Sequence, residues 1–163
     1  MSRGQKWLLL GLLLLGTKLA LPFSGSDVSE LTPVEALVVT QEQGQVVVDG
    51  GACRGRGATW AAALQDLRQG ADGRAFLSTA EQIVLCGAAG ELLEDVIADR
   101  KLRPAASVCL CEGEPPAPER AAAFLRKKSD VTLRRLRAAR LRDEAVELPV
   151  LIQWEGGLRL ERP

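Results

Sequence analysis

The feature that most restricts the fold of this chain is a series of short β-rich runs separated by helical patterns. The first two runs, residues 35–40 (EALVVT) and 45–49 (QVVVD), have only four residues between them, and Gly44 is the last of the four. Glycine readily adopts the left-handed backbone of a tight turn. The two runs are therefore predicted to form a β-hairpin.

The rest of the chain alternates between apolar runs and helical periodicity. Residues 80–86 (AEQIVLC) and 106–111 (ASVCLC) predict buried strands. The order hairpin, helix, strand, helix, strand, helix predicts an α/β (α+β) fold in which helices flank a mixed β-sheet. We expect this domain to cover residues 27–145, followed by an extended C-terminal segment at 146–163. The helices are predicted over residues 59–70, 90–101, 119–128 and 131–142.

The first 26 residues have the pattern of a targeting segment. Arg3 and Lys6 precede residues 7–15, an apolar run that only Gly11 interrupts. This pattern predicts a signal peptide or an uncleaved N-terminal membrane anchor, and it places the domain outside the cytoplasm. The run is shorter than the roughly 20 residues that a spanning helix needs. The small residues at 24–26 (SGS) are a weak cleavage signal for a signal peptidase.

Composition excludes several classes of function. The chain has 21 cationic and 21 acidic residues, and without the three N-terminal cations the balance is 18 against 21. A net charge of about −3 argues against a nucleic-acid-binding domain. The chain has no His and no Tyr, which removes the commonest general base and metal ligand. We therefore expect no enzyme, no catalytic residues and no cofactor.

The cysteines allow three interpretations. Cys86, Cys109 and Cys111 fall in predicted strands, and the last two share one face because side chains alternate along a strand. They are interpreted as ordinary core thiols, as a disulfide between Cys86 and Cys109, or as a zinc site that Cys53 and Cys86 would complete.

The glycine-rich residues 50–57 (GGACRGRG) lie between a predicted strand and a predicted helix. Phosphates bind at such helix N-termini. However, the stretch matches neither the dinucleotide fingerprint nor the P-loop. We interpret it as a flexible connecting loop.

The strongest surface signal is a basic helix near the end of the chain. Eight cations and only one acid, Asp130, lie between Arg126 and Arg142. A basic amphipathic helix can bind an anionic membrane or a partner. The alternative is a solvated face that pairs with nearby acids such as Asp143 and Glu144. The candidate membrane or partner face consists of Arg134, Arg135, Arg137, Arg140 and Arg142.

Several segments, taken in order, resemble one family. Residues 27–31 (DVSEL) precede the apolar residues 36–39, residues 82–87 (QIVLCG) precede residues 98–103 (ADRKLR), and an apolar strand with a small turn follows at 107–113. Together they resemble the N-terminal domain of the spore germination protein Ger(x)C family, the C subunits of germinant receptors in endospore-forming bacteria.

The resemblance implies a non-enzymatic extracytoplasmic subunit of a membrane complex. Its partners would be the A-type and B-type membrane subunits, and its location the spore inner membrane. The family has a lipid-bearing Cys and a Trp where this chain has Gly25 and Ser26, so the hydrophobic segment would here replace the lipid as the anchor. The alternative function is a secreted or membrane-anchored small binding module unrelated to germination.

Overall fold

The computed structural model describes residues 31–70, 74–126, 128–155 and 157–162. The targeting segment at 1–26 and the motif residues 27–30 lie outside the described residues. The strands are β1 (Leu31–Pro33), β2 (Ala36–Glu42), β3 (Gln45–Asp49), β4 (Arg54–Gly57), β5 (Arg74–Phe76), β6 (Gln82–Cys86), β7 (Ser107–Glu112), β8 (Val150–Trp154) and β9 (Gly157–Glu161). The helices are α2 (Trp60–Gly70), α3 (Leu93–Ala98), α4 (Pro118–Leu125) and α5 (Leu133–Leu141), with 3₁₀ turns η2 (Leu77–Thr79) and η3 (Gly87–Leu92).

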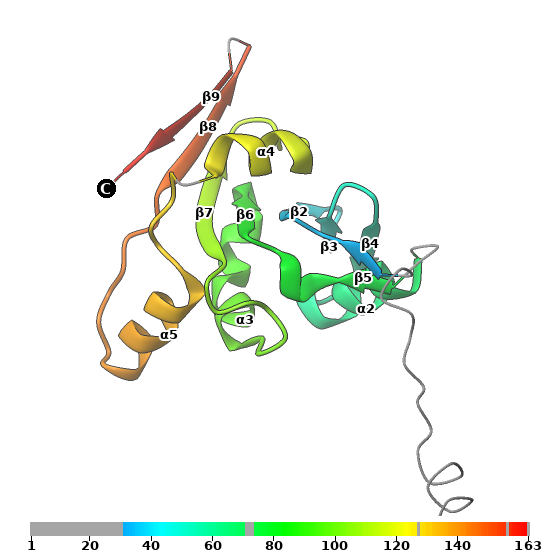
Figure 1. Cartoon of the computed structure of the whole chain (residues 1–163), viewed down its shortest axis with the longest axis horizontal. Helices are drawn as coiled ribbons and strands as arrows, with labels where there is room; N and C mark the ends of the chain where they lie inside the picture. Colours follow the sequence, from blue (N-terminus) through cyan, green and yellow to red (C-terminus); the bar gives the residue numbers. More distant parts are fainter. Residues whose placement is uncertain (1–30, 71–73, 127, 156, 163) are drawn as a thin grey trace, which may run out of the picture.

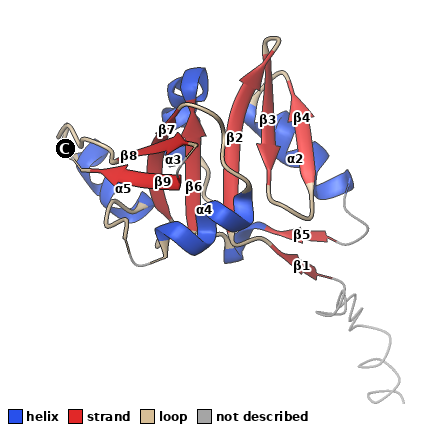
Figure 2. Ribbon diagram, turned by 90° about the horizontal axis from the view of Figure 1, so that it is seen from above, coloured by secondary structure: helices blue, strands red, loops and turns tan. Residues whose placement is uncertain are grey.

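A seven-stranded mixed sheet organises the fold, with the order β4-β3-β2-β6-β7-β8-β9. The four central strands, β2, β6, β7 and β8, are parallel to one another, and each end of the sheet is completed by antiparallel strands. β1 and β5 form a separate parallel pair, which crosses beside the end of the main sheet in Figure 2. The protein therefore has an α/β fold with helices flanking a mixed sheet, which confirms the predicted fold class.

The alternation of side chains along the strands builds a core on each face of the sheet. Leu37 of β2 and Ile83 of β6 belong to the larger core, which α2, α3 and α5 cover. Their neighbours Val38 and Val84 belong to a smaller core on the opposite face, which α4 covers together with partly buried residues of β9. Figure 1 shows α4 on one side of β6 and β7, and α3 and α5 on the other.

The predicted hairpin is present, and a third strand, β4, extends it. β2 and β3 pair in register from Val38↔Asp49 to Glu42↔Gln45, and Gly44 has the positive φ of 77° that the turn requires. Part of the glycine-rich stretch that was interpreted as a loop forms β4, which pairs with β3. The C-terminal segment also joins the sheet, because β8 pairs with β7 and β9 pairs with β8.

The helix predicted over residues 90–101 is shorter and begins as a 3₁₀ turn. α3 ends at Ala98 because Asp99 has an extended backbone, with φ −72° and ψ 102°. The Asp99 carboxylate accepts a hydrogen bond from the backbone N–H of Lys101 over 2.9 Å. Such an Asx turn offers the backbone an alternative to the helix.

The glycines of β4 are explained by the close approach of α2. A Cβ on Gly55 would overlap the backbone oxygen of Ala63 and the backbone nitrogen of Leu67. A Cβ on Gly57 would meet the backbone of the same helix. The glycines therefore allow α2 to lie against the strand, and they are accounted for without a bound phosphate.

We expect Gly55→Ala to lower the free energy of unfolding by about 2–3 kcal/mol or more, because the added methyl group overpacks a backbone contact. Gly70→Ala is the matched control, since its Cβ would meet only Arg54 O at 3.8 Å. Urea unfolding monitored by circular dichroism measures both. Equal stability of the two variants would contradict the close-packing explanation.

Candidate functional site

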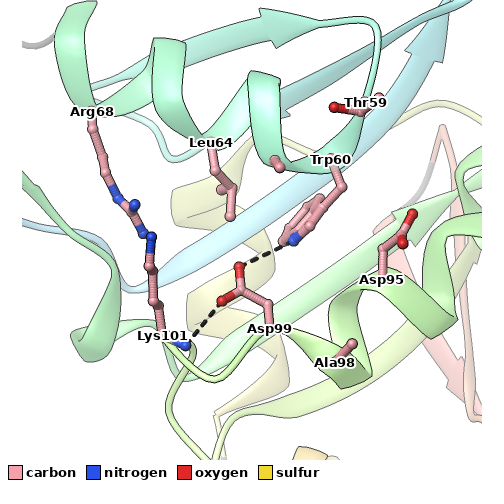
Figure 3. A pocket seen from close by; sticks show the side chains of 9 residues that line it. Thr59, Trp60, Leu64, Arg68, Asp95, Ala98, Asp99 and Lys101 are labelled. Carbon is pink, nitrogen blue, oxygen red and sulfur yellow. Dashed lines mark hydrogen bonds between the residues drawn. The ribbon is translucent and has the colours of Figure 1, made fainter.

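An open pocket lies between the N-terminal half of α2 and the C-terminal end of α3 (Figure 3). Its volume is about 440 Å³. The indole ring of Trp60 forms its inner wall, and the residue is 4 % exposed. The lining residues are Thr59, Trp60, Ala61, Leu64, Arg68, Asp95, Ala98, Asp99 and Lys101.

Asp99 holds the parts of this pocket together. Its Oδ2 accepts a hydrogen bond from Trp60 Nε1 over 3.2 Å, while Oδ1 accepts from the backbone N–H of Lys101. Thr59 fixes the start of α2, because its Oγ1 accepts from the backbone N–H of Ala62 over 3.2 Å. The tryptophan ring is therefore held in place by both helices rather than by one.

Charge is unevenly distributed around the pocket. Figure 3 shows the side chains of Arg68 and Lys101 pointing toward one another along one wall, while Asp95 lies on the opposite side. Two cations at one wall beside an indole ring suit a small molecule with an anionic group and an apolar part. The sequence analysis did not identify this pocket, because its residues come from α2, from α3 and from the turn after α3.

The five arginines of the predicted membrane or partner face divide into three groups, and Arg142 lies directly after the end of α5. Arg137 turns inward, where its guanidinium donates to Ile97 O over 2.9 Å and to Asp99 O over 2.7 Å. It therefore satisfies carbonyl groups at the C-terminal end of α3. Arg140 pairs with Glu94 at 3.0 Å, and Arg142 pairs with Glu144 at 3.4 Å. The solvated-pair interpretation thus fits two of the five side chains, and a structural role fits a third.

The remaining two arginines form the outward face of the helix. Arg134 and Arg135 are exposed, and within the described residues neither makes an ion pair. Leu141, the last residue of the same helix, is 89 % exposed. These three residues, called the α5 outward face below, combine cationic charge with an exposed apolar side chain.

The cysteines are free thiols in the structure, and all four are buried. Cys86 of β6 lies across from Cys111 of β7, whereas Cys109 lies across from Val84. The predicted pairing of Cys86 with Cys109 is therefore not the one that the strand register favours. Cys53 belongs to the core on the other face of the sheet, so it cannot join the other three in a zinc site, and within the described residues no group of three or more His, Cys, Asp or Glu side chains could hold a metal.

Burial and mutual contact shift the pKa values of these thiols. Burial raises the pKa of Cys109 to about 12, and the neighbouring Cys111 adds to the shift. A hydrogen bond between the Cys86 and Cys111 thiols raises the pKa of Cys86 and lowers that of Cys111. Burial, followed by the charge of Asp49, raises the pKa of Cys53.

Among the helices of the described residues, none is both long and apolar enough to cross a membrane. Comparison of the chain with family models, with curated proteins and with solved structures gave no match.

We expect Asp99→Ala to destabilise the protein by about 1–3 kcal/mol, because it leaves the buried Trp60 N–H without an acceptor. Asp95→Ala is the control, since its side chain lines the same pocket and is exposed. Urea unfolding curves of both variants give the comparison. A loss for Asp95→Ala as large as that for Asp99→Ala would show that the hydrogen bond to Trp60 does not matter.

The thiol pKa values predict a loss of stability in alkali. A pKa of about 12 for folded Cys109, against 9.0 for its unperturbed thiol, means that the folded state holds the proton more tightly. The contribution of the Cys109 thiol to the free energy of unfolding is fully present below about pH 9 and is lost as pH rises toward 12. Under reducing conditions, the free energy of unfolding of the parent protein should fall more steeply above about pH 9 than that of Cys109→Ala. Parallel curves for the two proteins would contradict the shift.

Proposed function

We propose that the protein is a non-enzymatic, extracytoplasmic subunit of a membrane complex that resembles spore germinant receptors. In this proposal the N-terminal hydrophobic segment tethers the α/β domain to the membrane. The A-type and B-type membrane subunits implied by the resemblance are its partners.

The observation that carries this proposal is the α5 outward face. Arg134 and Arg135 are not neutralised by acids of the described part of the chain, and Leu141, at the end of the same helix, is almost fully exposed. Unpaired arginines on the same helix as an exposed apolar residue suit an anionic membrane surface or a membrane-associated subunit. Figure 1 shows α5 at the periphery of the molecule, where such a surface can reach it.

The segments that carry the resemblance can be located in the fold. The apolar segments that carry it, at 36–39, 82–87 and 107–113, form β2, β6 and β7 at the centre of the sheet. Residues 98–103 form the last residue of α3 and the turn that follows it. Residues 27–30 of the N-terminal motif at 27–31 lie outside the described residues.

The pocket of Figure 3 favours the second candidate, a secreted or membrane-anchored binding module unrelated to germination. Arg68 and Lys101 would hold the anionic group of a small ligand, and Trp60 would contact its apolar part. Both candidates are non-enzymatic. They differ in whether the protein acts within a membrane complex.

The double variant Arg134→Glu/Arg135→Glu tests the proposal. Each cation near an anionic surface contributes about 1 kcal/mol, so its reversal should weaken association at least about fivefold. The full chain is expressed in an endospore-forming bacterium, and its co-purification with multi-spanning receptor subunits from detergent-solubilised spore membranes is measured. We expect the parent protein to co-purify and the double variant to be depleted several-fold.

The control is Arg100→Glu/Arg120→Glu, which makes the same change of charge at exposed positions outside α5. This control should behave like the parent protein. Recovery of the parent protein from the culture supernatant would rule out the receptor proposal and leave the secreted binding module. Equal depletion of both double variants would show that net charge, rather than the α5 outward face, controls the association.

A further inference from the structure

Of the three cysteines under α4, Cys86 and Cys111 face each other on adjacent strands, and Cys109 lies next to them. Cys86 is the last residue of β6, and its partner in the parallel register is Cys111 of β7. Cys109 precedes Cys111 by two residues on the same face of β7. All three belong to the smaller core, and their residues are 5 %, 1 % and 2 % exposed for Cys86, Cys109 and Cys111.

Strand geometry selects one of the two pairings. Adjacent strands lie about 4.8 Å apart, and a disulfide joins Cα atoms separated by about 4.4–6.8 Å. The register partners Cys86 and Cys111 fall within this range of Cα separation. Cys109 lies two residues further along, a diagonal of about 8 Å, which is beyond the reach of a disulfide.

The Cys111 thiol lies directly beneath the surface. Its Sγ donates to Glu112 O over 3.8 Å and to Glu114 O over 4.0 Å. Residues 112–115 of the loop above it are exposed, and Gly113 adopts a positive φ of 90° there. Of the two cysteines of β7, Cys111 is the one next to this exposed loop, and Cys109 lies two residues further from the end of the strand.

The two thiols of the pair also differ in reactivity. The Cys86 thiol donates its hydrogen bond to Cys111, which lowers the pKa of Cys111. A thiolate is the nucleophile in thiol–disulfide exchange. Cys111 is therefore the attacking thiol and Cys86 the resolving one.

We propose that Cys86 and Cys111 form a redox-active dithiol that is oxidised to an intramolecular disulfide by a small-molecule disulfide, while Cys109 stays reduced. The Cys111 thiolate attacks one sulfur of the oxidant, which releases one thiolate and leaves a mixed disulfide on Cys111. Cys86 then loses its proton and attacks the Cys111 sulfur, which expels the second thiolate. In total, two protein thiols lose two protons and two electrons, and one disulfide is reduced to two thiols. This inference holds whether or not the α5 outward face contacts a membrane.

The experiment uses the full chain in detergent, oxidised with glutathione disulfide under native conditions and then alkylated in denaturant. Trypsin leaves Cys86 in one peptide and both Cys109 and Cys111 in another. We expect the titratable thiols to fall from four to two, and a cross-link to join these two peptides. The cross-link should persist in Cys109→Ser and disappear in both Cys86→Ser and Cys111→Ser.

Three results would overturn the inference. One is a cross-link that persists in Cys111→Ser, because it would place Cys109 in the pair. Another is a cross-link to the peptide that contains Cys53. The third is retention of all four thiols in a protein whose circular dichroism confirms that it is folded. The cysteine-to-serine variants are checked for folding in the same way, and the Cys109→Ser result decides the question if either partner variant fails to fold.

Discussion

The arrangement of this protein depends on the burial of β6 from both sides. All five of its residues are buried, and it pairs in parallel with β2 on one edge and β7 on the other. Parallel strands need crossover connections, and these place helices on the faces of the sheet. The chain satisfies this need with α2 before β6 and with η3 and α3 after it. Both candidate sites follow from that strand, because the pocket lies between the helices on one face and the paired thiols lie on the other.

The core on the α2 side is continuous because the backbone of β4 carries no side chain where α2 crosses it. Gly55 and Gly57 alternate with Arg54 and Arg56, so the glycines face the helix and the arginines face solvent. Both arginines then pair with Glu42 of β2, at 3.0 Å and 3.6 Å. These exposed pairs contribute little stability. The small residues therefore determine the position of α2, and with it the position of Trp60 in the pocket.

The strands were predictable from the sequence to the extent that they are buried. Runs such as 45–49 and 106–111 are apolar because each strand contributes to a core, and this pattern is visible without a structure. β4 has no apolar run, because glycine replaces the core-facing side chains, so its sequence is typical of a loop. The partner of Cys86 could not be predicted from the sequence either. The choice between Cys109 and Cys111 depends on the register of β6 against β7, which spacing along one strand does not encode.

The roles of the arginines of α5 were also only partly predictable from the sequence. Periodicity along a helix shows which residues share a face, but it does not show which neighbours offer acceptors. Arg137 faces the end of α3, where the extended backbone of Asp99 leaves carbonyl groups to be satisfied. The turn at Asp99 thus has two effects: its carboxylate fixes Trp60 and its carbonyl binds Arg137. Arg137 is held inside, and Arg140 and Arg142 pair with acids. Only Arg134 and Arg135 therefore remain without an acidic partner in the described residues. The positive charge available on the outward face is smaller and more localised than the sequence indicates. A surface that depends on two arginines and one leucine can be removed by a double substitution, whereas a helix with five available arginines would keep most of its charge.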